Sequence, residues 1–172
     1  MAKSSLEFIS LLDRLLAENG VPYWIFGGWT VDFYTGRVRR PHGDVDILIW
    51  QSDCAKAREL LTGNGFREEP LYHADEHTRF FLDDEQVDVI YLVRRESGDV
   101  VTPGRWADWP YPPNTFHDAR YAIGDTRAPV VHPDCMADTY RQFDAKSAEA
   151  KLKAKHHKDF KDLLAYMRSR RA

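Results

Sequence analysis

The sequence has few cysteines and no long apolar run. Cys54 and Cys135 are far apart, and neither belongs to a C-x-x-C pair, which excludes a disulfide framework and favours a reducing compartment. The first residues lack the apolar stretch of a signal peptide, and no segment approaches the roughly 18 apolar residues of a transmembrane helix. We therefore expect a cytoplasmic protein with no membrane partner.

Several common metal-binding and nucleotide-binding signatures are missing as well. His132 and Cys135 have an H-x-x-C spacing that is unusual for zinc, and no second cysteine pair completes a site with His156 and His157. No glycine loop is followed by Lys-Ser or Lys-Thr, and G-x-G-x-x-G does not occur. The sequence therefore favours neither a zinc site nor a P-loop or dinucleotide-binding domain.

The remaining composition is typical of a folded domain, with 172 residues, 43% hydrophobic and 30% charged. The charge is uneven: residues 1–93 carry 9 Lys and Arg against 16 Asp and Glu, whereas residues 94–172 carry 15 against 11. An acidic first half disfavours nucleic acid as a partner, because a phosphate backbone needs a continuous basic track. A basic second half is suited to the phosphates of a small molecule.

Apolar periodicity and turn residues predict an alternation of helices and strands. We expect helices over 6–16, 29–34, 53–62, 134–143 and 146–168, and strands over 23–26, 44–50, 78–82, 86–93 and 127–131. The Pro- and Trp-rich residues 94–126 are expected to be irregular. We place a boundary near residue 94, between a core over 1–93 and a C-terminal substrate-binding, mainly helical region over 94–172.

Gly27 and Gly28 stand between a predicted strand and a predicted helix. Glycine lets the backbone approach a ligand closely, and the following helix offers free N–H groups and the positive end of its dipole to a phosphate. A tight turn without a ligand would explain the pair equally well. Both interpretations stay open from these two residues alone.

Three aspartates form the strongest chemical pattern. Asp44 and Asp46 are two residues apart on a predicted strand, so both carboxylates leave on one face while Val45 and Ile47 point to the other. Two like charges side by side require a cation or water, and carboxylate oxygens are the ligands that Mg²⁺ prefers. Asp88 is a lone acid in a β-branched strand, which fits either a salt bridge with an arginine or a place beside the other two aspartates.

Together these patterns resemble a known family. The segment from Tyr23 to Ile47 contains G-G-W-x-x-D, then basic residues, then H-x-D-V-D-I. This order is similar to that of the aminoglycoside and lincosamide nucleotidyltransferases, which modify antibiotics and belong to the DNA polymerase β-like superfamily. The resemblance is dense over residues 22–49, extends to Asp88 and is faint over 94–172.

The resemblance implies an α+β fold, with a mixed sheet flanked by helices, and a Mg²⁺-dependent transfer of a nucleoside monophosphate, expected to be AMP from ATP, to a hydroxyl of a small molecule. Asp44, Asp46 and Asp88 would be the metal-binding and catalytic residues, and Asp88 would share a metal or act as the general base. The implied nucleotide-binding residues are Gly27, Gly28, Arg40, His42 and Lys155. We expect a monomer or a homodimer.

Two other functions and the identity of the acceptor stay open. A protein-modifying nucleotidyltransferase of a toxin–antitoxin module would use the same chemistry, although such modules usually have G-S in place of Gly27-Gly28. A non-catalytic nucleotide-binding module is disfavoured by the presence of all three carboxylates. As for the acceptor, the acidic residues between 68 and 85 would attract a polycationic aminoglycoside, whereas the aromatic residues over 106–116 suit a less charged lincosamide.

Overall fold

The computed structural model of the chain describes residues 5–70, 73–146 and 154–170. Its helices are α1 (Leu6–Ala17), α2 (Gly28–Thr35), α3 (Cys54–Gly63), α4 (Pro133–Lys146) and α5 (Ala154–Ser169), with 3-10 helices η1 (Gln51–Asp53) and η2 (Gly104–Trp106). Its strands are β1 (Tyr23–Phe26), β2 (Val45–Trp50), β3 (Arg67–Glu69), β4 (His77–Leu82), β5 (Glu85–Arg94), β6 (Val100–Val101), β7 (Arg120–Ile123) and β8 (Thr126–Pro129). Within the described ranges, no helix combines the length and the apolar character needed to cross a membrane.

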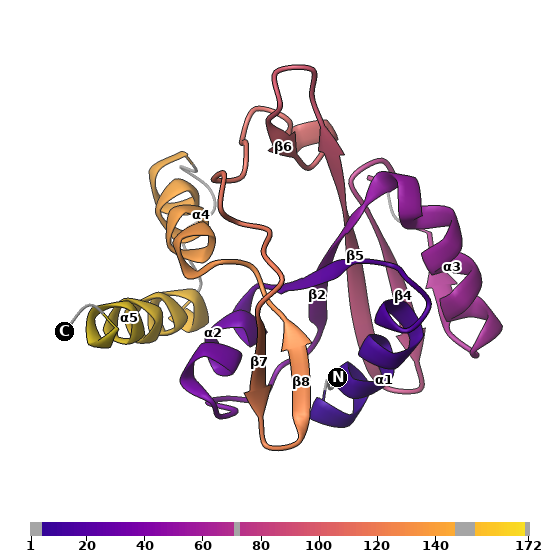
Figure 1. The fold of residues 1–172 in the computed structure, drawn as a ribbon, viewed down its shortest axis with the longest axis horizontal. Helices are drawn as coiled ribbons and strands as arrows, with labels where there is room; N and C mark the ends of the chain where they lie inside the picture. The colour runs from indigo at the N-terminus through magenta and orange to yellow at the C-terminus, as the bar shows by residue number, and fades with distance from the viewer. Residues whose placement is uncertain (1–4, 71–72, 147–153, 171–172) are drawn as a thin grey trace.

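One mixed sheet organises the molecule (Figure 1). Its strands lie in the order β1-β2-β5-β4-β3, and β6 pairs with the end of β5. β2 and β5 run parallel, whereas β1 with β2 and β4 with both of its neighbours run antiparallel. Ile47, Leu48 and Ile49 of β2 are completely buried, so both faces of this strand are covered. The predicted α+β class, a mixed sheet flanked by helices, is confirmed.

Helices gather at two ends of this sheet (Figure 1). α1 and α3 lie at one end, and α2, α4 and α5 at the other. α1 begins at Ser5, whose hydroxyl accepts the N–H of Phe8 as an N-cap. Aromatic pairs hold the second group together: Tyr34 and Tyr166 join α2 to α5, with ring centroids 5.0 Å apart. In the first half of α5, Asp159 lies beside Gly28, the first residue of α2.

Some short elements were missed in the sequence. β6, η2 and β7 lie within residues 94–126, which were predicted to be irregular, and β7 forms a hairpin with β8. β3 was missed as well. Two to four residues carry too little periodic signal, and such strands exist because a neighbouring strand completes their hydrogen bonds. The predicted last helix, 146–168, starts at a residue that instead ends α4, and residues 147–153 of that prediction lie outside the described residues.

Candidate active site

The three predicted aspartates converge at the centre of the sheet. Asp46 of β2 lies directly opposite Asp88 of β5 in the parallel register, and Asp44 immediately precedes β2. Residues paired across a sheet, and residues two apart on a strand, share one face. Each aspartate offers a carboxylate oxygen, and these oxygens lie within 4.8 Å of one another. The geometry matches that expected of a shared cation site.

The electrostatics of this cluster also favour a cation. Burial, together with the charges of Asp44 and Asp88, raises the pKa of Asp46 to about 8. A carboxylate resists ionisation when it is desolvated beside like charges. A divalent cation relieves that repulsion, and oxygen-rich sites of this kind suit Mg²⁺. The donor set therefore fits the metal that the sequence resemblance implies.

Asp88 contacts Arg79 and Gln86 while it also lies beside Asp44 and Asp46. Its oxygens accept hydrogen bonds from Arg79 of the adjacent β4, from Nε at 2.7 Å and from Nη2 at 2.9 Å. Gln86 donates a longer bond of 3.3 Å. The salt bridge that the sequence left as an alternative is therefore present, and the place beside Asp44 and Asp46 is present too. A bidentate guanidinium fixes the plane of a carboxylate, so Arg79 orients Asp88 toward the cluster.

A cavity of about 270 Å³ opens on the glycine side of the cluster. We call it the glycine-side cavity. Seven of the eight predicted site residues line it, namely Gly27, Gly28, Arg40, His42, Asp44, Asp46 and Lys155. They come from the turn before α2, from the loop before β2 and from the start of α5. The fold therefore gathers into one cavity residues that stand up to 128 positions apart in the sequence.

The glycine pair fits closely against the acidic strand. Gly27 has φ +72°, a conformation that favours glycine. A Cβ added there would come within 2.6 Å of Asp46 Oδ2, and one added at Gly28 would meet the guanidinium of Arg40. α2 starts at Gly28, so its first turn, including Trp29, faces the cavity. Both a strained turn and a close approach of backbone to the cluster therefore require glycine here.

The three side chains predicted to bind the nucleotide differ in how they are held. Arg40 is committed to Asp159 of α5, through Nη2–Oδ2 at 2.7 Å and Nε–Oδ1 at 3.2 Å. His42 is buried against the ring of Trp29, with centroids 4.2 Å apart. Its Nε2 lies 2.7 Å from Asp32 Oδ2, and it carries the proton because a carboxylate only accepts. Lys155 is exposed at the cavity, which leaves its ammonium in contact with solvent.

Sequence reasoning gave no role to a buried charge network beneath this cavity. Arg39 bridges Asp32 at 2.7 Å, Asp159 at 2.9 Å and Asp162 at 2.7 Å. The side chains of Asp32 and Asp159 are completely buried. Asp32 is the last residue of the G-G-W-x-x-D pattern, so a polar residue at that place was visible. Nothing local indicated Asp159, which acts from α5.

A second cavity, of about 260 Å³, opens on the other side of the cluster. We call it the aromatic cavity, after four of the residues that line it: Phe26, Trp106, Trp109 and Tyr111. Asp46 and Asp88 also line it. Asp46 therefore borders both cavities, and so do Phe26, Ile90 and Thr139.

With this geometry in view, comparison with known proteins identifies the family. A family model described as aminoglycoside-2''-adenylyltransferase matches residues 8–163. The chain belongs to this family. The match covers both cavities and the charge network, and it confirms the resemblance seen in the sequence.

Individual relatives of this adenylyltransferase family are similar over shorter stretches. A 2''-aminoglycoside nucleotidyltransferase of Escherichia coli is 43% identical over 44 residues, which is 24% of this chain and 25% of the relative. A lincosamide resistance protein of Staphylococcus haemolyticus is 36% identical over 61 residues, 36% of this chain and 37% of that one. These alignments span well under two thirds of either relative.

The fold is similar over nearly the whole chain. The lincomycin-bound crystal structure of the lincosamide antibiotic adenylyltransferase LnuA superposes with a TM-score of 0.71 and 21% identity, covering 96% of this chain and 99% of that one. The chain therefore has the fold of this lincosamide antibiotic adenylyltransferase. The adenylyltransferase family model itself implies a nucleoside triphosphate as co-substrate.

Proposed function

We propose that this chain transfers AMP from ATP to a hydroxyl group of an aminoglycoside or lincosamide antibiotic, with Mg²⁺ held by Asp44, Asp46 and Asp88. The observation that carries the proposal is the position of Asp46, which borders two cavities of similar volume. A transferase of this type needs two substrates that meet at one point. The triphosphate occupies the glycine-side cavity, and the acceptor occupies the aromatic cavity.

The reaction exchanges one bond to phosphorus for another. The acceptor hydroxyl oxygen attacks the α-phosphorus, the bond from that phosphorus to the bridging oxygen of pyrophosphate breaks, and pyrophosphate leaves. The hydroxyl proton passes to a carboxylate oxygen of Asp88, which lines the acceptor side. Bound Mg²⁺ would neutralise charge that develops on the phosphates. Arg79 holds Asp88 in place during the transfer.

The glycine-side residues bind and orient the triphosphate. Backbone N–H groups at Gly27 and Gly28 approach the phosphates closely, because no side chain stands between. Lys155 supplies an exposed positive charge. The charge of Arg40 is largely balanced by its ion pair with Asp159. Arg40 therefore orients the triphosphate through hydrogen bonds more than it adds net positive charge. His42 donates to Asp32 and supports the loop that carries Asp44.

The second part of the chain supplies most of the acceptor side. Thr102, Arg105 and the aromatic residues of 106–111 line the aromatic cavity, and Asp138 of α4 lines it too. These positions support the proposed division at residue 94 into a core and a substrate-binding region. Aromatic rings offer stacking surfaces to an apolar part of an acceptor, and Asp138 offers a carboxylate to an amine.

A labelled-nucleotide assay tests the proposal. The protein is incubated with Mg²⁺ and α-labelled ATP or GTP, together with lincomycin or tobramycin, and the label is followed into the antibiotic. We expect label in at least one antibiotic, equimolar release of pyrophosphate and no reaction in the presence of EDTA. Asp46→Asn is the inactive control, and Asp84→Asn, an exposed carboxylate in the β4–β5 turn, is the active one.

Two outcomes would contradict the proposal. Label that enters added protein but neither antibiotic would assign the chain to protein modification. Binding of ATP without release of pyrophosphate with any acceptor would assign it to the non-catalytic alternative.

A further inference from the structure

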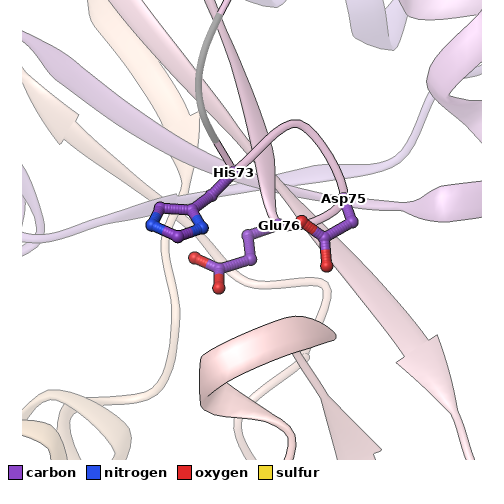
Figure 2. A group of neighbouring side chains, drawn as sticks. All are labelled: His73, Asp75 and Glu76. Atoms are coloured by element: carbon purple, nitrogen blue, oxygen red, sulfur yellow. The ribbon is translucent and has the colours of Figure 1, made fainter.

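Glu76 is a buried carboxylate in the turn that leads into β4. Only 1% of the residue is exposed, and His73 and Asp75 flank it in the same turn (Figure 2). Its oxygens accept hydrogen bonds from Arg105, from the backbone N–H at 2.8 Å, from Nε at 2.9 Å and from Nη2 at 2.8 Å. The indole of Trp106 donates a further bond of 3.1 Å. One carboxylate therefore binds both η2 residues that follow Gly104.

The turn over residues 73–76 resembles a metal-binding site in its ligand atoms, but the guanidinium of Arg105 already supplies the positive charge. His73, Asp75 and Glu76 offer ligand atoms within 4.8 Å of one another. Hydrogen bonds from Arg105 lower the pKa of Glu76 to about 2. A guanidinium that binds both carboxylate oxygens makes a strong, directional contact. The turn is therefore built to hold η2.

Gly104 lets η2 lie directly against the turn. Its φ is +69°, and an added Cβ would come within 2.6 Å of Glu76 Oε1 and 2.9 Å of Asp75 Oδ2. No side chain fits between the two backbones. The contact is thus short and leaves little freedom for η2 to shift.

Glu76, Arg105 and Trp106 all line the aromatic cavity, so the contact between the turn and η2 forms part of its wall. The rings of Trp106 and Trp109 pack edge to face, with centroids 5.1 Å apart, and both line the cavity. The backbone of Glu76 is fixed in turn, since its carbonyl accepts the N–H of Tyr91 at 2.9 Å. Tyr91 stands three residues after Asp88 on β5. A continuous series of contacts therefore leads from the catalytic strand to the aromatic wall.

We propose that Glu76 is a positioning residue for the acceptor: it fixes Arg105 and Trp106, and so sets the distance between the aromatic wall and Asp88. This inference rests on the proposed function, because it assigns the aromatic cavity to the acceptor. It assigns Glu76 no contact with the triphosphate. Loss of Glu76 should therefore weaken acceptor binding and leave nucleotide binding intact.

Steady-state kinetics of Glu76→Gln test this prediction, with lincomycin and tobramycin as acceptors. The amide keeps the shape of the side chain but presents N–H groups to the guanidinium, so the paired contact is lost. We expect the acceptor KM to rise about tenfold or more, as for loss of a charged hydrogen-bonded pair, with the KM for ATP unchanged within about twofold. Arg105→Met, at a half-exposed side chain, should give the same change, and the double variant should be no worse than either alone.

A matched control and hydrogen exchange separate positioning from general damage. Glu68→Gln removes an exposed ion pair with Arg58 and should leave both KM values unchanged. In Glu76→Gln, amides of residues 104–109 should exchange faster, while those of 23–50 should not. If Glu76→Gln does not fold, Arg105→Met decides in its place.

The possible failures are distinct. An unchanged acceptor KM in folded Glu76→Gln, or an equal rise in both KM values, would overturn the positioning role. Absence of transfer by the unmodified protein would overturn the proposed function, and with it the acceptor role. Unchanged exchange over 104–109 would overturn the contact itself, whatever the activity.

Discussion

The two cavities that meet at Asp46 are built in opposite ways. Most residues that line the glycine-side cavity come from the single segment 26–46, and the others come from β5, α4 and α5. The walls of the aromatic cavity come from several separate segments, and Glu76 has to hold Arg105 from 29 residues away. A wall made from one segment leaves a motif in the sequence, whereas a wall assembled by long-range contacts does not. The glycine-side cavity is therefore easier to predict from the sequence. We expect single substitutions there to lower activity more than substitutions around the aromatic cavity.

The largest effect should come from the residue shared by both cavities. Asp46→Asn removes a carboxylate from the cluster, and kcat should fall by about 10³ or more, because a lost metal removes charge stabilisation worth several kcal/mol. Turnover of labelled ATP measures the change. Asp84→Asn removes an exposed carboxylate nearby and should keep full activity. Near-normal turnover in Asp46→Asn would contradict a catalytic role for the residue that the two cavities share.

Asp88→Asn should have the next largest effect on kcat. This variant also distinguishes a general base from a residue that only binds the metal. If it is the general base, kcat should fall by roughly 10²–10⁴, with binding of Mg-ATP changed by no more than a few-fold. The acidic limb of the kcat–pH profile should flatten as well. Calorimetry of Mg-ATP binding beside the pH–rate profile makes the distinction. Weakened binding with an unchanged acidic limb would mark Asp88 as a metal ligand only.

Gly27→Ala should disturb the aspartate cluster from the glycine side. The new Cβ would press on Asp46 Oδ2, and a shift of a catalytic group by about 1 Å can cost on the order of 10²-fold. We expect kcat/KM for ATP to fall by about that factor. Gly124→Ala is the matched control, because Gly124 also has positive φ, at +58°, with open space around its Cβ position. Equal losses in the two variants would show backbone strain to be the cause.

The charge network should matter for stability. Asp159→Asn removes the buried carboxylate that Arg39 and Arg40 share, while Arg39 keeps its pair with Asp32. Breaking a buried pair costs about 3–5 kcal/mol. Urea unfolding followed by tryptophan fluorescence gives the difference. Glu68→Gln, at an exposed pair, should change the free energy of unfolding by less than about 1 kcal/mol. A small effect at Asp159 would mean that α5 is held mainly by its aromatic contacts.

The smallest effect should be the pH dependence that Glu76 adds on the aromatic side. Arg105 depresses its pKa from 4.5 to about 2. A group whose pKa is depressed by folding stabilises the protein fully above the unfolded value and loses that contribution as pH falls through the folded value. Stability should therefore decline between about pH 4.5 and pH 2, and Glu76→Gln should make this decline shallower. Identical acid-unfolding curves for Glu76→Gln and the unmodified protein would contradict this pH dependence.

The sequence predicted the fold class through its family resemblance, and it named seven of the fourteen residues that line the glycine-side cavity. From the residues themselves, Asp88 stayed open between a salt bridge and a place in the cluster. Local rules suffice for most of the seven: side chains two apart on a strand share a face, and a glycine pair between strand and helix brings backbone close to a ligand. The family pattern added Arg40, His42 and Lys155. Their roles in binding stay predictions.

Only the tertiary structure decided what surrounds them. The parallel register of β2 and β5 places Asp88 opposite Asp46, and no local pattern specifies which strands pair. Asp159 reaches Arg40 across 119 residues, and Glu76 binds Arg105 across 29 residues that include β4, β5 and β6. Such partners depend on how whole elements pack, because burial of a charge is tolerated only where the folded chain supplies its counter-charge.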